Sequence, residues 1–148
     1  MWAVAVGAVL LLALEADPAA RGLRALEAGN YAEAAEALEQ AVAADPNDFA
    51  AHFNLAYART MLGDRARAIA AYRKVLELKP GLYQAQLNLG ILLLEAEQAA
   101  EALPLLRAAA AQEPGKFQPH YHLARALDAL ADDAGAEEHF RKAAALDP

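Results

Sequence analysis

The 148-residue sequence contains no cysteine and no serine. The lack of cysteine excludes disulfides, thiolate zinc sites and thiol catalysis, and the lack of serine excludes a serine nucleophile. Basic residues are in the minority, because 13 Lys and Arg stand against 20 Asp and Glu, for a net charge of −7. Since phosphate backbones are bound by clustered Lys and Arg, we expect no nucleic-acid partner.

Long uncharged runs are also scarce, and the one at the start, residues 2–14, is short. As a helix it would span about 20 Å against roughly 30 Å of hydrocarbon, so a full membrane crossing is not expected. It resembles a signal-peptide core with a cut after Ala16, although no Lys or Arg precedes Trp2. We expect residues 1–16 to be a signal or anchor of an exported or membrane-associated protein; the alternative is an apolar helix that packs on the next one in a cytoplasmic protein.

The remaining sequence carries a repeat with a period of about 34 residues, a usual length for a helical repeat. Prolines recur at this period, at Pro46, Pro80, Pro114 and Pro148. Small and large apolar residues recur with them, at Ala34, Leu38, Ala41, Ala68, Tyr72, Val75, Ala102, Leu106, Ala109, Ala136, Phe140 and Ala143. The flanking apolar residues follow helical spacing, so each unit is predicted to be two helices. Because one helical hairpin cannot bury its own apolar face, stacked neighbours must supply the core.

The sequence also predicts how the two helices of a unit are joined. Gly29 and Gly63 are suited to the left-handed conformation that ends a helix. Asn30 and Asp64 follow them and can cap the next helix with their side chains.

The stretches that end at the last three prolines resemble the tetratricopeptide repeat family. They are "NLAYARTMLGDRARAIAAYRKVLELKP" (54–80), "NLGILLLEAEQAAEALPLLRAAAAQEP" (88–114) and "HLARALDALADDAGAEEHFRKAAALDP" (122–148). The resemblance covers about residues 17–148 and implies an all-α, right-handed superhelical solenoid of stacked antiparallel helix pairs. The expected units are about 17–48, 49–82, 83–116 and 117–148, after the apolar segment 1–16.

Four positions depart from the family pattern. Glu97 and Ala131 replace the turn glycine, so we expect those turns to use another conformation or a longer helix. Pro104 lies early in a second helix, which is tolerable if that helix begins near Glu101 and would otherwise bend it. Arg21 takes the place of a core leucine, so the first helix of the first unit is less regular.

The resemblance places the first helix of each pair on an inner, concave wall. The residues expected to contact a peptide there are Phe53, Asn54, Tyr57, Gln84, Asn88, Ile91, Tyr121, His122 and Arg125. Asn54, Asn88 and His122 follow one another at the repeat period and would form a row, whose amides can donate to and accept from peptide backbone. The alternative is that asparagine is common at this position in the family and is merely solvated.

Nothing in the sequence predicts catalysis, a metal site or a cofactor. His120 and His122 are two residues apart and point to different sides of a helix, and His139 beside Glu137 and Glu138 is expected on a solvated face. There is no Gly-rich phosphate loop after a strand.

We therefore expect a non-catalytic scaffold that binds a peptide segment of a partner protein in its concave groove. The alternative is an assembly or self-association module that uses its end helices, among them the uncapped C-terminal end near Phe140, and is tethered to a membrane by residues 1–14. A third reading is an accessory domain of a larger enzyme.

Overall fold

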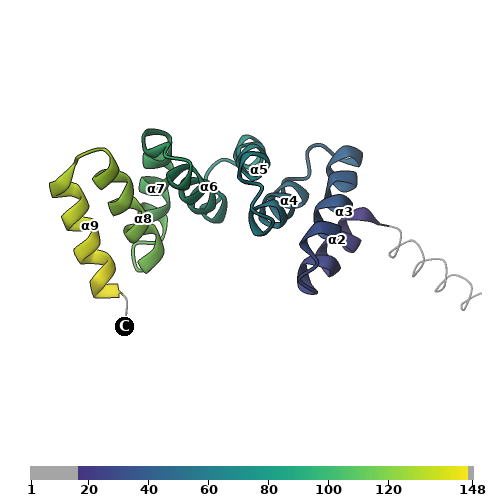
Figure 1. Cartoon of the computed structure of the whole chain (residues 1–148), viewed down its shortest axis with the longest axis horizontal. Helices are drawn as coiled ribbons and strands as arrows, with labels where there is room; N and C mark the ends of the chain where they lie inside the picture. The colour runs from purple at the N-terminus through teal and green to yellow at the C-terminus, as the bar shows by residue number, and fades with distance from the viewer. Residues whose placement is uncertain (1–16, 147–148) are drawn as a thin grey trace, which may run out of the picture. The chain divides into compact units, whose positions relative to one another are not determined.

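The computed structural model describes residues 17–146, and every regular element in this range is an α-helix (Figure 1). The helices are α2 Pro18–Glu27, α3 Tyr31–Ala44, α4 Phe49–Met61, α5 Arg65–Leu78, α6 Tyr83–Glu95, α7 Ala99–Gln112, α8 Phe117–Ala129 and α9 Asp133–Leu146. The predicted all-α fold of paired helices is confirmed. The expectation for residues 1–16 concerns a segment outside the described range.

The helices form two compact units, each of which holds two helix pairs. The N-terminal unit contains α2 to α5 and the C-terminal unit contains α6 to α9. Within each unit, every helix packs on the next one along the chain. The first helices of the two pairs also touch, α2 with α4 and α6 with α8, so they lie side by side.

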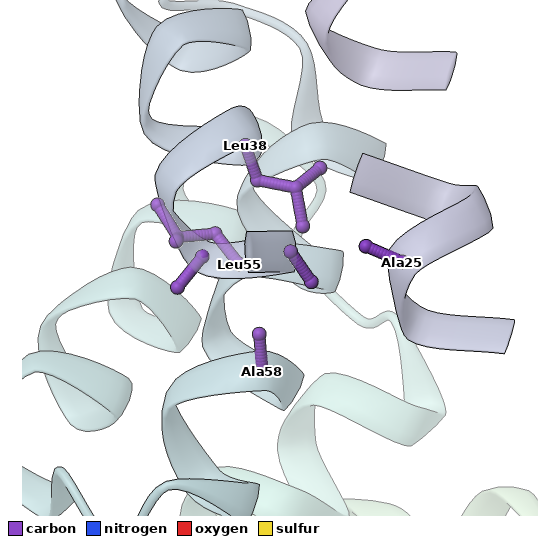
Figure 2. Close-up of a cluster of buried hydrophobic side chains, with 6 residues drawn as sticks. Ala25, Leu38, Leu55 and Ala58 are labelled. Atoms are coloured by element: carbon purple, nitrogen blue, oxygen red, sulfur yellow. The ribbon is translucent and has the colours of Figure 1, made fainter. Parts of the chain in front are cut away.

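The core consists of the small residues that the repeat predicted. All eight of the recurring small positions are buried: Ala34, Ala41, Ala68, Val75, Ala102, Ala109, Ala136 and Ala143. Between them in the N-terminal unit, Leu38 and Leu55 reach into the space between α2, α3 and α4, with Ala25 and Ala58 at its sides (Figure 2). Because alanine has no side chain beyond Cβ, the helices approach closely, and the buried large residues fill the remaining space.

The turns within the four pairs share one backbone conformation. Gly29 and Gly63 have φ of 75° and 73°, and Glu97 and Ala131, at the matching positions, have φ of 61° and 59°. In all four turns the following N–H donates to the carbonyl five residues earlier, at 2.8–2.9 Å. The expectation of another conformation at Glu97 and Ala131 was wrong, because this bonding pattern requires the left-handed residue whatever its side chain.

We expect the replacement of Glu97 or Ala131 by glycine to stabilise the protein. A side chain in the left-handed region costs about 1–2 kcal/mol, and glycine removes this cost. Part of the gain is lost because glycine gives the unfolded chain more conformational entropy. The free energy of unfolding, measured with urea, should rise by about 0.5–1 kcal/mol for each change. Ala100→Gly is the matched control, since Ala100 is exposed in α7 with helical backbone, and there the same change should lower stability by about 1 kcal/mol. Equal signs for Ala131→Gly and Ala100→Gly would contradict the argument.

Only one of the two predicted side-chain caps is present. Asp64 Oδ1 accepts from the backbone N–H of Arg67 at 3.3 Å. Asn30 makes no such bond, so that prediction was wrong; its backbone, at φ −86° and ψ 69°, is not extended as a capping residue usually is. The carbonyl of Asn30 accepts from the N–H of Ala34 at 2.9 Å, as the carbonyl of Asp64 accepts from Ala68 at 3.0 Å.

Helix α7 begins at Ala99, two residues before the start that would place Pro104 comfortably. Pro104 is consequently the sixth residue of the helix, and α7 continues unbroken to Gln112. The proline therefore lies inside a helix rather than in its first turn.

Candidate protein-interaction surface

In the N-terminal unit, the predicted contact residues lie on α4 and differ in exposure. Phe53 is half-buried, and its ring meets the edge of the buried Tyr72 ring at 5.5 Å between centroids. Asn54 is also half-buried, whereas Tyr57 is 39% exposed and packs edge-on against Tyr31 at 6.3 Å. Phe53 thus contributes to the core of its own pair, and Tyr57 offers an aromatic ring to solvent.

Two residues of this surface were missed by the sequence reasoning. Leu23 on α2 is 45% exposed and lies one repeat period before Tyr57, so it holds the same repeat position on the neighbouring first helix. Tyr31 supports the Tyr57 ring from the start of α3. The repeat period would have identified Leu23, but nothing in the spacing indicates the Tyr31 contact.

In the C-terminal unit, the predicted residues lie on two helices that touch each other. Gln84, Asn88 and Ile91 are on α6, and Tyr121, His122 and Arg125 are on α8. Gln84 is exposed, and Asn88 and Ile91 are half-buried. Because α6 and α8 are in contact, the equivalent positions of Asn88 and His122 lie on adjoining helices.

Tyr121 is the centre of an aromatic cluster on α8. It stacks on Phe117 at 5.3 Å, meets the edge of the His122 ring at 5.2 Å and lies 6.0 Å from Phe140 of α9, all between ring centroids. The guanidinium carbon of Arg125 stands 6.0 Å from the Tyr121 ring, at the limit of a cation–π contact. Since Tyr121 is still 37% exposed, the cluster presents an aromatic face beside a positive charge.

His122 is held in its neutral form. Burial of the imidazole, and secondly the positive charge of Arg125, lowers the pKa of His122 to about 4. Its Nδ1 atom is buried and has no hydrogen-bond partner among the described residues. A buried N–H without an acceptor is rarer in proteins than a buried acceptor without a donor, so we place the ring proton on Nε2.

The lowered pKa of His122 makes stability depend on pH. The unfolded chain takes up the proton near the ordinary pKa of 6.5, while the folded chain resists it down to about 4, so acid favours unfolding in this window. We expect the His122 contribution to be fully present above pH 6.5 and to fall by about 1–2 kcal/mol as the pH drops to 4, less than the full shift implies because solvent screens a half-buried group.

The measurement compares urea unfolding at pH 7.5 and pH 4.5 for the natural protein and for His122→Asn. Asparagine is the residue that units two and three carry at this position, as Asn54 and Asn88. The difference between the two proteins isolates His122 from the carboxylates that also titrate in acid. A variant that loses as much stability in acid as the natural protein would contradict the assignment.

His139 is not on a fully solvated face, so that expectation was wrong. It stacks on the buried His120 at 5.3 Å between centroids, with the two Nδ1 atoms 3.1 Å apart. His120 Nε2 donates to the Pro114 carbonyl at 3.0 Å, so its Nδ1 is left to accept from His139. Burial, followed by the charge of Lys142, lowers the pKa of His139. The pair joins α8 to α9 as a structural contact.

His52 shows that the His120 bond belongs to the repeat. Its Nε2 donates to the carbonyl of Pro46 at 3.0 Å, six residues earlier, as His120 does to Pro114. His120 and His122 point to different sides of α8 as predicted, since His120 is buried and His122 is half-buried in contact with Tyr121.

The structure brings together only part of the predicted row. Asn88 and His122 lie on touching helices of one unit, while Asn54 belongs to the other unit. The row as a whole, like the peptide contacts of its members, stays a prediction.

Residues 17–146 contain no group of three or more His, Asp or Glu side chains arranged to hold a metal ion. None of the helices in this part of the chain combines the length and the apolar character that a membrane span needs.

Comparisons with known proteins agree with the repeat. The tetratricopeptide repeat family matches residues 19–83 and 87–148. A solved structure of MamA from Desulfovibrio magneticus RS-1 is 32% identical, with a TM-score of 0.81 over 86% of this chain and 72% of that one. Another MamA crystal structure is 21% identical, with a TM-score of 0.80 over 90% of this chain and 82% of that one, and shows the fold alone. No curated protein sequence matches the chain.

The matches cover most of the chain and agree with the helix pairs described above. Repeats of this kind are typical of non-catalytic scaffolds for protein interaction. The chain belongs to the tetratricopeptide repeat family.

Proposed function

We propose that this scaffold binds a peptide segment of a partner protein along the exposed face of its first helices. The observation that carries the proposal is the group formed by Tyr121, His122 and Arg125 on α8, a helix in contact with α6, which carries Asn88. It combines an exposed aromatic ring, a cation, a neutral imidazole and an amide on two helices of one unit.

The polar members of this group suit a peptide backbone. With its proton on Nε2, His122 can donate to a peptide carbonyl, and the pKa of about 4 keeps it in this form at neutral pH. The Asn88 amide can both donate to a carbonyl and accept from an N–H. Because both contacts are to backbone, they favour an extended segment of any sequence.

The apolar members would select the side chains of that segment. In the C-terminal unit, Tyr121 is a large apolar group left open to solvent. The N-terminal unit has a surface of the same kind of its own, formed by Tyr57 with Leu23. Arg125 beside Tyr121 favours an acidic residue at the neighbouring position of the ligand. Since each hydrogen bond returns only about 1 kcal/mol and the ligand must be ordered, we expect micromolar affinity.

The test uses the full chain as bait against a displayed library of random peptides. The natural protein is compared with Asn54→Ala/Asn88→Ala, which removes one backbone contact from each unit. We expect the natural protein to enrich a defined set of peptides, and the double variant to lose at least 10-fold in affinity for them by isothermal titration calorimetry.

The matched control is Arg73→Ala/Arg107→Ala. These arginines are also one repeat period apart, but they are exposed on the second helices α5 and α7. Circular dichroism should show equal helicity for all three proteins. Peptides that bind all three equally, or no enrichment by the natural protein, would overturn the proposal. The role of residues 1–16 as signal or anchor stays a prediction, since they lie outside the described residues.

A further inference from the structure

Each unit has one end helix with an outer face of interest, α2 in the N-terminal unit and α9 in the C-terminal unit. Within each unit, the second helix of one pair packs on the first helix of the next, α3 on α4 and α7 on α8. No helix in the described part of the chain packs in this way on the outer face of α2 or against that of α9 (Figure 1).

The internal contacts of this kind are apolar. Ala35 of α3 belongs to one buried cluster with Leu55 and Ala58 of α4. In the contact of α7 with α8 the matching residues are Leu103, Leu123 and Ala126. All six residues are apolar, and Leu123 and Ala126 are buried as Leu55 and Ala58 are.

At the end helices the same three positions are charged, and their signs are opposite. Glu137 of α9 stands where Ala35 stands in α3, and its side chain is 71% exposed. Arg21 and Arg24 of α2 stand where Leu55 and Ala58 stand in α4, Arg24 exposed and Arg21 half-buried. The register that joins α3 to α4 would thus bring one carboxylate against two guanidinium groups.

Among the residues that the structure describes, the partners of Glu137 and Arg21 are weak ones. Glu137 pairs with Arg141 on the same helix at 2.5 Å, and both side chains are more than two-thirds exposed. Arg21 Nη2 donates to Gln40 Oε1 at 2.8 Å, on the exposed surface. Exposed pairs of this kind contribute little, so exchanging them for a pair between chains costs little. Phe140 next to Glu137 is 37% exposed and adds apolar area to the contact.

We propose that α9 of one copy of this chain packs on α2 of a second copy, in the register of α3 on α4, with Glu137 between Arg21 and Arg24. The occupant is a second copy because the two complementary faces are both present on every chain, so one copy offers α9 and the next offers α2. The charged residues of this contact, Glu137, Arg21 and Arg24, are not among the residues of the peptide surface proposed above. A helix-on-helix contact is smaller than a standard interface, so the association is weak and depends on salt.

The test is sedimentation velocity of the full chain over a range of concentrations at low and high salt. We expect reversible self-association that weakens at least 10-fold from low to high salt, and at least 10-fold in Glu137→Lys. Glu138→Lys is the matched control, because Glu138 is the next residue on α9 and lies at a repeat position that is exposed in every pair. It should associate as the natural protein does.

Charge exchange makes the test specific to the proposed pair of faces. The variant Arg24→Glu and the double variant Arg21→Glu/Arg24→Glu should also associate at least 10-fold more weakly. The single variant is included because the half-buried Arg21 could be needed for folding. An equimolar mixture of Glu137→Lys and Arg21→Glu/Arg24→Glu chains should associate again, because each charged face then meets its opposite. The proposal would be overturned by a natural protein that stays monomeric, by association that persists in Glu137→Lys, or by a mixture that does not associate again. Association that grows with salt would also overturn it, because contact through the apolar residues 2–14 would behave in that way.

Discussion

Leu106→Ala is expected to lower the free energy of unfolding by about 2–5 kcal/mol. The Leu106 side chain is fully buried in the C-terminal unit, where α6 and α7 pack on each other. Its removal takes the largest buried side chain of α7 out of that helix pair and leaves a cavity between α6 and α7. Urea unfolding followed by circular dichroism measures the loss.

Gly90 explains why Leu106 is so closely fitted. A Cβ added at Gly90 would stand 2.7 Å from both Cγ and Cδ2 of Leu106, closer than real side chains approach. Overpacking in Gly90→Ala should therefore lower the free energy of unfolding by about 1–3 kcal/mol. The higher helix propensity of alanine offsets up to about 1 kcal/mol of this loss. Gly115→Ala is the control, because a Cβ there meets nothing within 4 Å.

The two changes should compensate each other when combined. With Leu106 reduced to alanine, the Cβ at position 90 finds space and fills part of the cavity. The double variant Gly90→Ala/Leu106→Ala should then be more stable than the sum of the single losses predicts, by about 1 kcal/mol or more. Strictly additive losses would mean that Gly90 is needed for a reason other than the close approach of Leu106.

The constant repeat period was enough to predict the helix pairs and most of the core. It fixed which residues face inward, because a small residue is needed wherever two helices meet at the same place in every pair. Leu38, Tyr72 and Leu106 are accordingly almost fully buried. Phe140 holds the same position but is 37% exposed, since the described residues include no helix beyond α9 to cover it.

Predictions from the backbone preferences of single residues failed where the packing of the repeat fixes the backbone conformation. Glu97 and Ala131 adopt the left-handed turn at a local cost of about 1–2 kcal/mol, because the packing of the pair fixes the turn geometry. The contact of His120 with His139 could not be predicted from the sequence either, since it depends on the direction of two side chains from different helices. The candidate surface was predicted by position, but the neutral state of His122 follows only from its burial and from Arg125.

Pro104→Ala is expected to raise the free energy of unfolding by about 2 kcal/mol. As the sixth residue of α7, Pro104 has no N–H to donate to the carbonyl of Ala100, and its ring crowds that carbonyl. Proline in a helix interior costs about 3 kcal/mol relative to alanine, of which up to about 1 kcal/mol returns because alanine makes the unfolded chain more flexible. Alanine is already present at this repeat position in α5, as Ala70.

Pro119→Ala is the matched control, because the same substitution there has the opposite expectation. Pro119 is the third residue of α8, where a backbone N–H has no partner within the helix, so alanine restores no helical hydrogen bond. Pro119 is also almost fully buried, and its loss removes packing. Urea unfolding should therefore show a gain for Pro104→Ala and a loss for Pro119→Ala. A loss at both positions would show that α7 depends on Pro104 for its shape, and that the missing hydrogen bond at Ala100 is not what limits its stability.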